Sequence, residues 1–384
     1  MKTRSKRTVF AVVGLASALA LVILMAHAQS GSAQSVPAGS KMAEEVYKNI
    51  QVLKGVPADQ VIPAMQFISA SLGVDCEHCH VEHAFDKDDK KPKLTARKMI
   101  QMMFAINKDN FNGHREVTCY SCHHGASDPA GTPLIADEEP KPEPRGAMNA
   151  GGTNPVVMPT PDQLLEKFVQ ALGGADALQK ISSRVEKGTL TGFGGRQLPV
   201  EVLAKAPDKR LSVVHLPNGD SITAFDGRVG WLGNSGRPAR EMSGGEIDGA
   251  RFDADFYFPV HINRTFSQLR VERPEKVGDQ ETYLVLGANP GQPPVRMYFS
   301  QQSALLVRLV RYVETPLGRN PTQIDYADYR DVDSVKVPFR WTLARPGGRF
   351  TIQVEQLQQN VPIDDAKFAK PPEPVPPAPN PTSP

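Results

Sequence analysis

The sequence predicts a multidomain protein, with a small all-α head followed by a C-terminal, mainly antiparallel β domain of the α+β class. Three changes of pattern along the 384 residues lead to this prediction. Residues 41–128 are rich in Lys, Met and His and have helical periodicity. Residues 129–161 are dominated by Pro, Gly and charge, which is typical of a linker. From about residue 184 onward, short β-branched or aromatic runs alternate with turn residues.

The N-terminus has the pattern of an export signal. A basic segment, residues 2–7, precedes the apolar residues 9–25 and a small-residue site that ends at Ala28. Residues 1–28 are therefore predicted to be a signal peptide, and residues 9–25 acting as an uncleaved inner-membrane anchor is the alternative. Both interpretations put the rest of the chain in the periplasm, an oxidising compartment where free cysteine pairs would not stay reduced.

The head contains a degenerate repeat. In the first unit Val61, Met65, Ile68 and Leu72 fall on one helical face that ends at Gly73, and residues 76–80 follow as CEHCH. The second unit is predicted to begin with Thr95 as N-cap, and residues 119–123 complete it as CYSCH. We expect its helix to place on one face Met99, Met102, Met103 and Ile106.

The β domain is predicted over residues 162–370. A short helix is expected at 161–172, before Gly173 and Gly174, and strands are expected at 198–207, 282–288, 295–300 and 349–356. In the last of these Phe350, Ile352 and Val354 alternate with polar residues, as in a half-buried antiparallel strand. The proline-rich residues 371–384 are expected to be disordered.

All four cysteines of the chain lie in the two CxxCH motifs, which we call the first motif (residues 76–80) and the second motif (residues 119–123). This pattern is typical of covalent haem attachment, in which both thiols add to the haem vinyl groups and the histidine binds iron. Cys76, Cys79, Cys119 and Cys122 are thus predicted haem anchors, and His80 and His123 proximal iron ligands. A zinc ribbon or redox disulfides are the alternatives, but the gap between the pairs is wide for zinc and no βαβ pattern surrounds them.

The distal ligands are less constrained by the residues alone. Met65 precedes the first motif, and Met99, Met102 and Met103 precede the second. Each methionine could instead fill the core. Four further histidines are also available in the head, namely His78, His83, His114 and His124. An open iron site would permit oxygen or peroxide chemistry.

The segment from Val46 through His124 resembles the cytochrome c subunit family of photosynthetic reaction centres, which is built from paired helix–loop–CxxCH units. The resemblance implies two covalently bound haem c groups, with Met65 as the first distal ligand. The family pattern of a methionine five residues before asparagine implies Met102, before Asn107, as the second, with Met99 and Met103 as rivals. Tetrahaem members carry two such pairs and this chain one, so the photosynthetic role does not transfer.

The second domain resembles the LolA/LolB-like lipoprotein carriers, an open antiparallel half-barrel over helices. Residues 224–231, 305–308 and 325–339 carry this resemblance, as strands joined by Gly and Asp turns. It implies that the domain could bind a lipid or lipoprotein. The alternative is that its large aromatic residues only fill a sheet core, namely Trp231, Phe256, Tyr298 and Trp341. The acidic run of Asp325, Asp328, Asp331 and Asp333 is expected to be a solvated turn rather than a calcium site.

These observations favour an exported dihaem c-type cytochrome that transfers single electrons between periplasmic or membrane redox partner proteins, an electron carrier rather than a catalyst. The β domain carries only His215 and His261 as histidines, and no nucleophile or phosphate motif. One alternative is a haem enzyme that reduces peroxide at an open iron site, and another is a lipid-binding β domain with a haem sensor. The formal net charge of +2 leaves no broad basic surface for nucleic acid.

Overall fold

The computed structural model describes residues 41–129, 158–192, 195–235, 237–346 and 348–372. The predicted signal peptide or anchor, most of the linker and nearly all of the C-terminal tail lie outside these ranges. None of the helices in the described part is long and apolar enough to cross a membrane.

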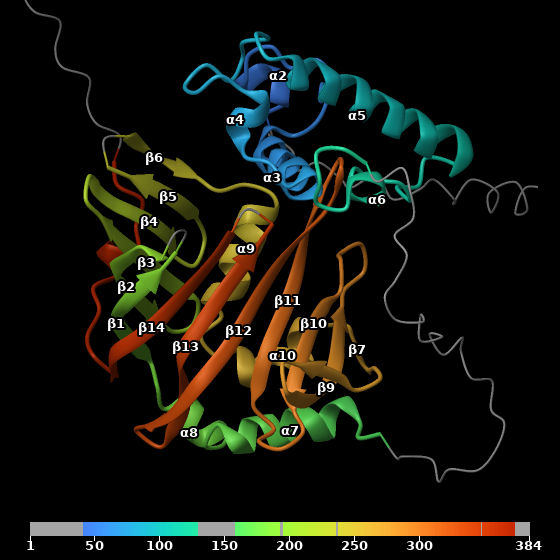
Figure 1. Cartoon of the computed structure of the whole chain (residues 1–384). Helices are drawn as coiled ribbons and strands as arrows, with labels where there is room; N and C mark the ends of the chain where they lie inside the picture. Colours follow the sequence, from blue (N-terminus) through green and yellow to red (C-terminus); the bar gives the residue numbers. More distant parts are fainter. Residues whose placement is uncertain (1–40, 130–157, 193–194, 236, 347, 373–384) are drawn as a thin grey trace, which may run out of the picture. The chain divides into compact units, whose positions relative to one another are not determined.

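The head, residues 41–128, consists of helices joined by loops (Figure 1). Its elements are α2 (Ala43–Val46), η1 (Ala58–Gln60), α3 (Val61–Leu72), α4 (Cys76–Cys79), α5 (Lys91–Asn110) and α6 (Tyr120–His123). The predicted end of α3 is confirmed, because Gly73 takes the left-handed conformation, with φ 66°, that suits a helix C-cap. The predicted start at Thr95 is wrong. Helix α5 begins at Lys91, with Pro92 in its first turn, where the missing N–H of proline costs nothing.

The apolar core of the head includes one residue from far along the chain. Leu53, Ala64, Ile100 and Met103 form a buried cluster together with Leu317, which lies between strands β11 (Leu306–Thr315) and β12 (Gly318–Val332). Leu317 is fully buried. The small head therefore completes its core with the tip of a β-hairpin.

The second domain is an antiparallel sheet, as predicted. The described residues give 14 strands in the order β6-β5-β4-β3-β2-β1-β14-β13-β12-β11-β10-β9-β7, with β8 also paired to β9. Besides β11 and β12 these are β1 (Ser183–Thr191), β2 (Gln197–Lys205), β3 (Lys209–Leu216), β4 (Gly219–Phe225), β5 (Gly230–Asn234), β6 (Arg237–Glu241), β7 (Gln268–Val271), β8 (Glu275–Val277), β9 (Gln280–Ala288), β10 (Val295–Ser300), β13 (Val335–Arg345) and β14 (Gly348–Gln359). The β1–β14 pair joins the two halves of the sheet, with Val185 opposite Gln358.

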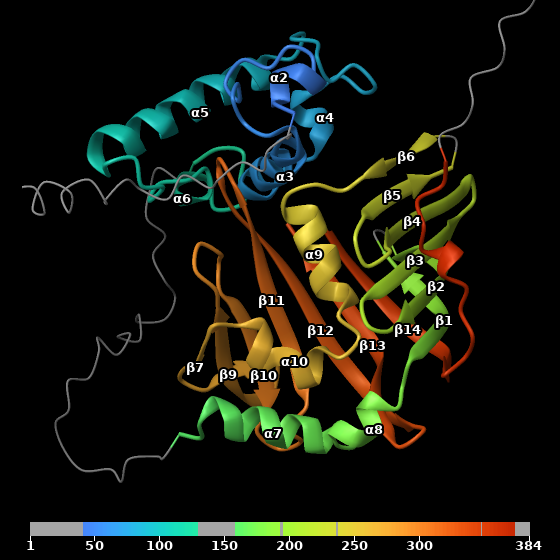
Figure 2. The ribbon, with the colours of Figure 1, turned by 180° about the vertical axis from the view of Figure 1, so that it is seen from behind.

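Helices cover one face of this sheet. Figures 1 and 2, which are opposite views, show α9 (Gly245–Ala254) and α10 (Phe258–Thr265) on the same face. Helix α7 (Pro161–Ala171) closely matches the predicted helix and begins with a capping box between Thr160 and Gln163. It packs Leu164, Leu165 and Phe168 against α10 and strands β9 to β11. The short α8 (Ala175–Gln179) leads into β1, and η3 (Asp365–Lys367) follows β14.

The predicted aromatic residues do fill the sheet core. Trp231 and Tyr298 are buried, and the half-buried Phe256 and Trp341 pack against a cluster that consists mainly of valines and isoleucines on β2, β13 and β14. The indole N–H of Trp231 donates to the Phe368 carbonyl oxygen at 2.8 Å, so the end of the chain closes the core beneath β5.

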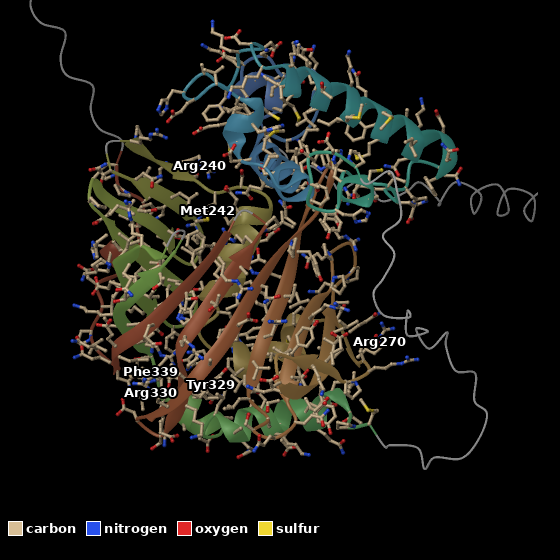
Figure 3. The ribbon with its side chains drawn as sticks, in the orientation of Figure 1. Arg240, Met242, Arg270, Tyr329, Arg330 and Phe339 are labelled. Carbon is tan, nitrogen blue, oxygen red and sulfur yellow. The ribbon has the colours of Figure 1, made fainter. Side chains whose placement is uncertain are left out.

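The acidic run on β12 and the turn after it is held by cations of the same chain. Arg308 pairs with Asp325 at 2.5 Å, Lys336 with Asp331 at 2.7 Å and Arg330 with Asp328 at 2.6 Å. The Arg330 guanidinium also lies 4.4 Å from the ring centroid of Phe339 (Figure 3). The expectation of a turn is therefore wrong for Asp325, Asp328 and Asp331, which lie on strand β12, and only Asp333 lies in the turn after it.

Candidate haem-binding site

Each CxxCH motif forms one helical turn that projects its two thiols. In the first motif, Asp75 caps α4 by accepting from the backbone N–H of His78 at 3.0 Å, and the His80 N–H donates to the Cys76 carbonyl oxygen at 3.0 Å. In the second motif the His123 N–H donates to the Cys119 carbonyl oxygen, also at 3.0 Å. The four cysteines, all within the described residues, are not joined by disulfides. The two turns share this closing hydrogen bond but differ by one residue in register, because His80 is extended and follows α4 whereas His123 is the last residue of α6.

The two motif histidines are oriented in the same way. The Nδ1 atom of His80 lies 2.9 Å from the Phe85 carbonyl oxygen, and Nδ1 of His123 lies 3.0 Å from the Ala126 carbonyl oxygen. Because a carbonyl oxygen only accepts, Nδ1 carries the proton in each ring and Nε2 keeps its lone pair. Proteins use this hydrogen bond to orient an imidazole that binds a metal through its other nitrogen.

A buried lysine holds the loop after the first motif. The Lys93 side chain on α5 is only 10% exposed, and its ammonium donates to the carbonyl oxygens of Phe85 at 2.9 Å and Lys87 at 2.6 Å. It also pairs with Asp88 at 2.9 Å, and Asp88 accepts from Arg97 at 2.8 Å. Hydrogen bonds from Arg97, and then from Lys93, hold the pKa of the Asp88 carboxyl well below its usual range.

A buried asparagine holds the loop before the second motif. On α5 the Asn107 side-chain amide donates to the Val117 carbonyl oxygen at 2.7 Å, and its oxygen accepts from the N–H groups of Glu116 at 3.0 Å and Val117 at 2.9 Å. The turn after this motif is tied to α3, since the Gly125 N–H donates to the Ser71 carbonyl oxygen at 2.8 Å. Both motifs are thus fixed by the long helices of the head.

The candidate methionines do not share one face, which corrects the sequence expectation for α5. Met103 turns into the head core and is 5% exposed, whereas Met99 and Met102 are 40% and 48% exposed. The reason is the helical period: Ile100, Met103 and Asn107 form the buried face, and Met99 and Met102 lie on the adjoining one. Met65 on α3 is half-buried and packs against the same core cluster.

Large apolar side chains are exposed in the head far more than in the sheet domain. Of nine exposed large hydrophobic residues in the described part of the chain, eight lie in the head: Val46, Ile62, Phe85, Leu94, Met99, Met102, Phe111 and Tyr120. Concentrated apolar exposure of this kind marks a binding surface. Together with four thiols, two oriented imidazoles and exposed thioethers, it fits an apolar, iron-containing ring such as haem.

The two cysteine pairs do not converge on one site in the described part of the chain. Burial raises the pKa of the Cys79 and Cys119 thiols. Within the described residues, which include every cysteine, no group of three or more Cys, His, Asp or Glu side chains converges to hold a metal ion. The two cysteine pairs therefore do not form the shared site that a zinc ribbon requires.

Two side chains that position the motifs, Lys93 and Asn107, were not identified from the sequence. A lysine or asparagine within an amphipathic helix looks like an ordinary surface residue. The available signal was the position of each residue on the face of α5 that also carries Ile100 and Met103. A polar residue on an apolar face is buried only when its donors are satisfied, and here loop carbonyl oxygens satisfy them.

These features define a c-type cytochrome domain, and comparison with known proteins supports this class. Residues 16–186 match the family described as "Photosynthetic reaction centre cytochrome C subunit". The N-terminal part of the chain is thus similar to the reaction-centre cytochrome subunits, and its two CxxC pairs are consistent with covalent haem c.

Two relatives illustrate this similarity. A photosynthetic reaction center cytochrome c subunit of Roseobacter denitrificans is 36% identical over 105 residues, which is 24% of this chain and 28% of that protein. Cytochrome c-554 of Chloroflexus aurantiacus is 35% identical over 85 residues, or 20% of each chain. The chain thus spans about a quarter of the length of the curated relatives it matches.

Among solved structures, a LolA superfamily protein from Nitrosomonas europaea is similar over 56% of this chain and 99% of its own, with 14% identity and a TM-score of 0.38.

Proposed function

We propose that the protein is an extracytoplasmic dihaem c-type cytochrome that passes single electrons between redox partner proteins. The observation that carries this proposal is the matched pair of CxxCH turns, in each of which a backbone carbonyl oxygen holds the histidine Nδ1. When bound, haem supplies the one-electron Fe(II)/Fe(III) couple. The protein supplies covalent anchors, axial ligands and an apolar surround.

The site residues have the following roles in this proposal. Cys76 and Cys79 hold one haem by thioether bonds, and Cys119 and Cys122 hold the other. His80 and His123 each present Nε2 to an iron. Phe85 and Tyr120, which are 56% and 53% exposed beside the two motifs, are suited to cover the faces or edges of the rings.

The distal ligands in this proposal are Met65 for the first haem and Met102 for the second. Met103 is the weaker rival, because its thioether is packed into the head core. Met99 is exposed and remains an alternative to Met102.

The sheet domain has a structural role in this proposal, as a scaffold for the head. Besides burying Leu317, the β11–β12 hairpin receives hydrogen bonds from Arg115 at the Thr315 carbonyl oxygen and at the Glu314 carboxylate. The side chain of Asn320 on β12 donates to the Pro63 carbonyl oxygen, in the first turn of α3, at 2.6 Å. These contacts link the sheet to the helix that bears Met65.

Absorption and electron paramagnetic resonance spectra of the purified holoprotein test the proposed function. Two low-spin haems with histidine–methionine ligation are expected, with no binding of carbon monoxide to the reduced protein. A high-spin haem that binds carbon monoxide would instead favour the alternative of peroxide reduction at an open iron site.

The proposed location is tested by the N-terminal sequence of protein from the periplasmic fraction. A chain that begins at Gln29 indicates cleavage after Ala28. An intact N-terminus in the membrane fraction indicates an anchor. Recovery of haem-free protein from the cytoplasm would contradict the proposed location.

A further inference from the structure

Two donors share one carbonyl oxygen beside the first motif, and the second motif has no such feature among the described residues. The Phe85 oxygen lies 2.9 Å from His80 Nδ1 and 2.9 Å from the Lys93 ammonium. At the second motif the Ala126 oxygen is the partner of His123 Nδ1 at 3.0 Å, and no cation donates to it. The two otherwise similar histidines thus have electrostatically different partners.

We propose that Lys93 is a positioning residue that raises the reduction potential of the haem at the first motif above that of the haem at the second. The inference rests on the proposed function and adds an order to its two redox sites. In this order the first site is the better electron acceptor, so an electron shared between the two sites resides mainly at the first.

Lys93 acts through His80. A carbonyl oxygen that accepts a hydrogen bond from the N–H at His80 Nδ1 makes the imidazole a stronger electron donor to iron, which favours Fe(III). A cation on the same oxygen draws electron density away from it and weakens that hydrogen bond. His80 is therefore a weaker donor than His123, and Fe(II) is favoured at the first site.

The charge of Lys93 acts in the same direction. Its side chain is only 10% exposed, so solvent and salt screen it weakly. Lys93 and Arg97 share a single carboxylate, that of Asp88, which leaves one net positive charge behind the Phe85 carbonyl. A nearby positive charge disfavours Fe(III), which carries one more positive charge than Fe(II). The other acids of this loop, Glu82, Asp86 and Asp89, are exposed and are screened by water.

The test is a spectroelectrochemical titration of the full-length holoprotein, which is expected to resolve two one-electron steps. In Lys93→Gln the amide retains a donor for the Phe85 oxygen but lacks the charge. We expect the midpoint potential of the higher-potential step to fall by about 59 mV, which is equivalent to about a tenfold change in the Fe(III)/Fe(II) equilibrium. The midpoint potential of the lower-potential step should not change. Lys93→Arg keeps the charge and should leave the higher step close to its original value.

Lys98→Gln is the matched control, because Lys98 lies on the same helix and is exposed. It removes the same charge and should move neither step appreciably. Asp88→Asn should shift the potential in the opposite direction. It removes the negative partner of Lys93 and should raise the midpoint potential of the higher-potential step. It also keeps the test decisive if Lys93→Gln does not load haem.

Three outcomes would overturn the inference. Lys93→Gln could shift the midpoint potentials no more than Lys98→Gln does, or it could shift only that of the lower-potential step. The third is a fall in the midpoint potential of the higher-potential step in Asp88→Asn. A protein without covalent haem would instead refute the proposed function, so the two failures are distinguishable. The Cys119→Ser/Cys122→Ser variant, which retains only the first motif, should show the higher potential alone; the lower potential alone would also overturn the inference.

Discussion

The head and the sheet domain differ in how they cover their apolar side chains. In the sheet domain the large side chains are packed between strands, helices and the C-terminal segment, as Phe225, Phe299 and Phe368 illustrate at 1%, 1% and 0% exposure. The head leaves Phe85, Tyr120 and other large apolar residues exposed around two cysteine pairs. The sheet domain is therefore complete as a polypeptide, whereas the head is a polypeptide shaped to hold another group.

The chain carries separate probes for its two regions. Both tryptophans, Trp231 and Trp341, lie in the sheet domain, so tryptophan fluorescence reports its unfolding. Haem absorbance would report the head. The two signals therefore follow the two regions separately.

The largest expected effect is loss of a haem. Cys119→Ser/Cys122→Ser should abolish covalent attachment at the second motif, lower the haem content by half and destabilise the head, since the apolar surface around the ring loses its cover. Pyridine haemochrome spectra measure the haem content. The sheet domain should keep its fluorescence-detected melting transition, and its loss in this variant would contradict the division into a complete and an incomplete region.

The next effect is confined to the sheet domain. Phe368 is fully buried beneath Trp231, and Phe368→Ala should lower the free energy of unfolding of this domain by about 3–5 kcal/mol. Chemical denaturation followed by tryptophan fluorescence measures the change. Haem content should stay at the wild-type level, and loss of haem in this variant would mean that the two regions are not separable.

Leu317 tests the link between the regions. Because this residue is fully buried in the head core yet belongs to the β11–β12 hairpin, Leu317→Ala should destabilise the head by about 2–5 kcal/mol. We expect the haem-detected denaturation midpoint to fall more than the fluorescence-detected one. Leu216→Ala, at a position 39% exposed on β3, is the matched control and should move neither. Equal shifts of both signals in Leu317→Ala would instead show one cooperative unit.

The smallest effect is a pH dependence of the sheet domain. Hydrogen bonds from Lys205 and Lys209 lower the pKa of Asp365 from 3.8 to about 2. Since the folded-state pKa is depressed, the stabilisation is fully present above about pH 4 and is lost as the pH falls through 2. The difference in melting temperature between wild type and Asp365→Asn, read by fluorescence, should be constant at neutral pH and shrink below pH 4. A difference that grows on acidification would contradict this assignment.

The sequence predicted the parts that depend on local pattern. Alternation in Phe350, Ile352 and Val354 identified β14, the glycine at residue 73 identified the end of α3, and the CxxCH spacing identified both motifs. The sequence could not predict contacts made across the fold. The placement of Met103 in the core depends on Leu317, more than 200 residues later, and the burial of Lys93 depends on loop carbonyl oxygens that only the folded chain brings together.

The most direct test of the central claim is the mass of the full-length protein, purified from the periplasm or membrane and then denatured with reductant. The account predicts the mass of the processed polypeptide plus two haem groups, and Cys76→Ser/Cys79→Ser should remove one of them. A denatured mass equal to the polypeptide alone would contradict it, because both cysteine pairs would then hold something other than covalent haem.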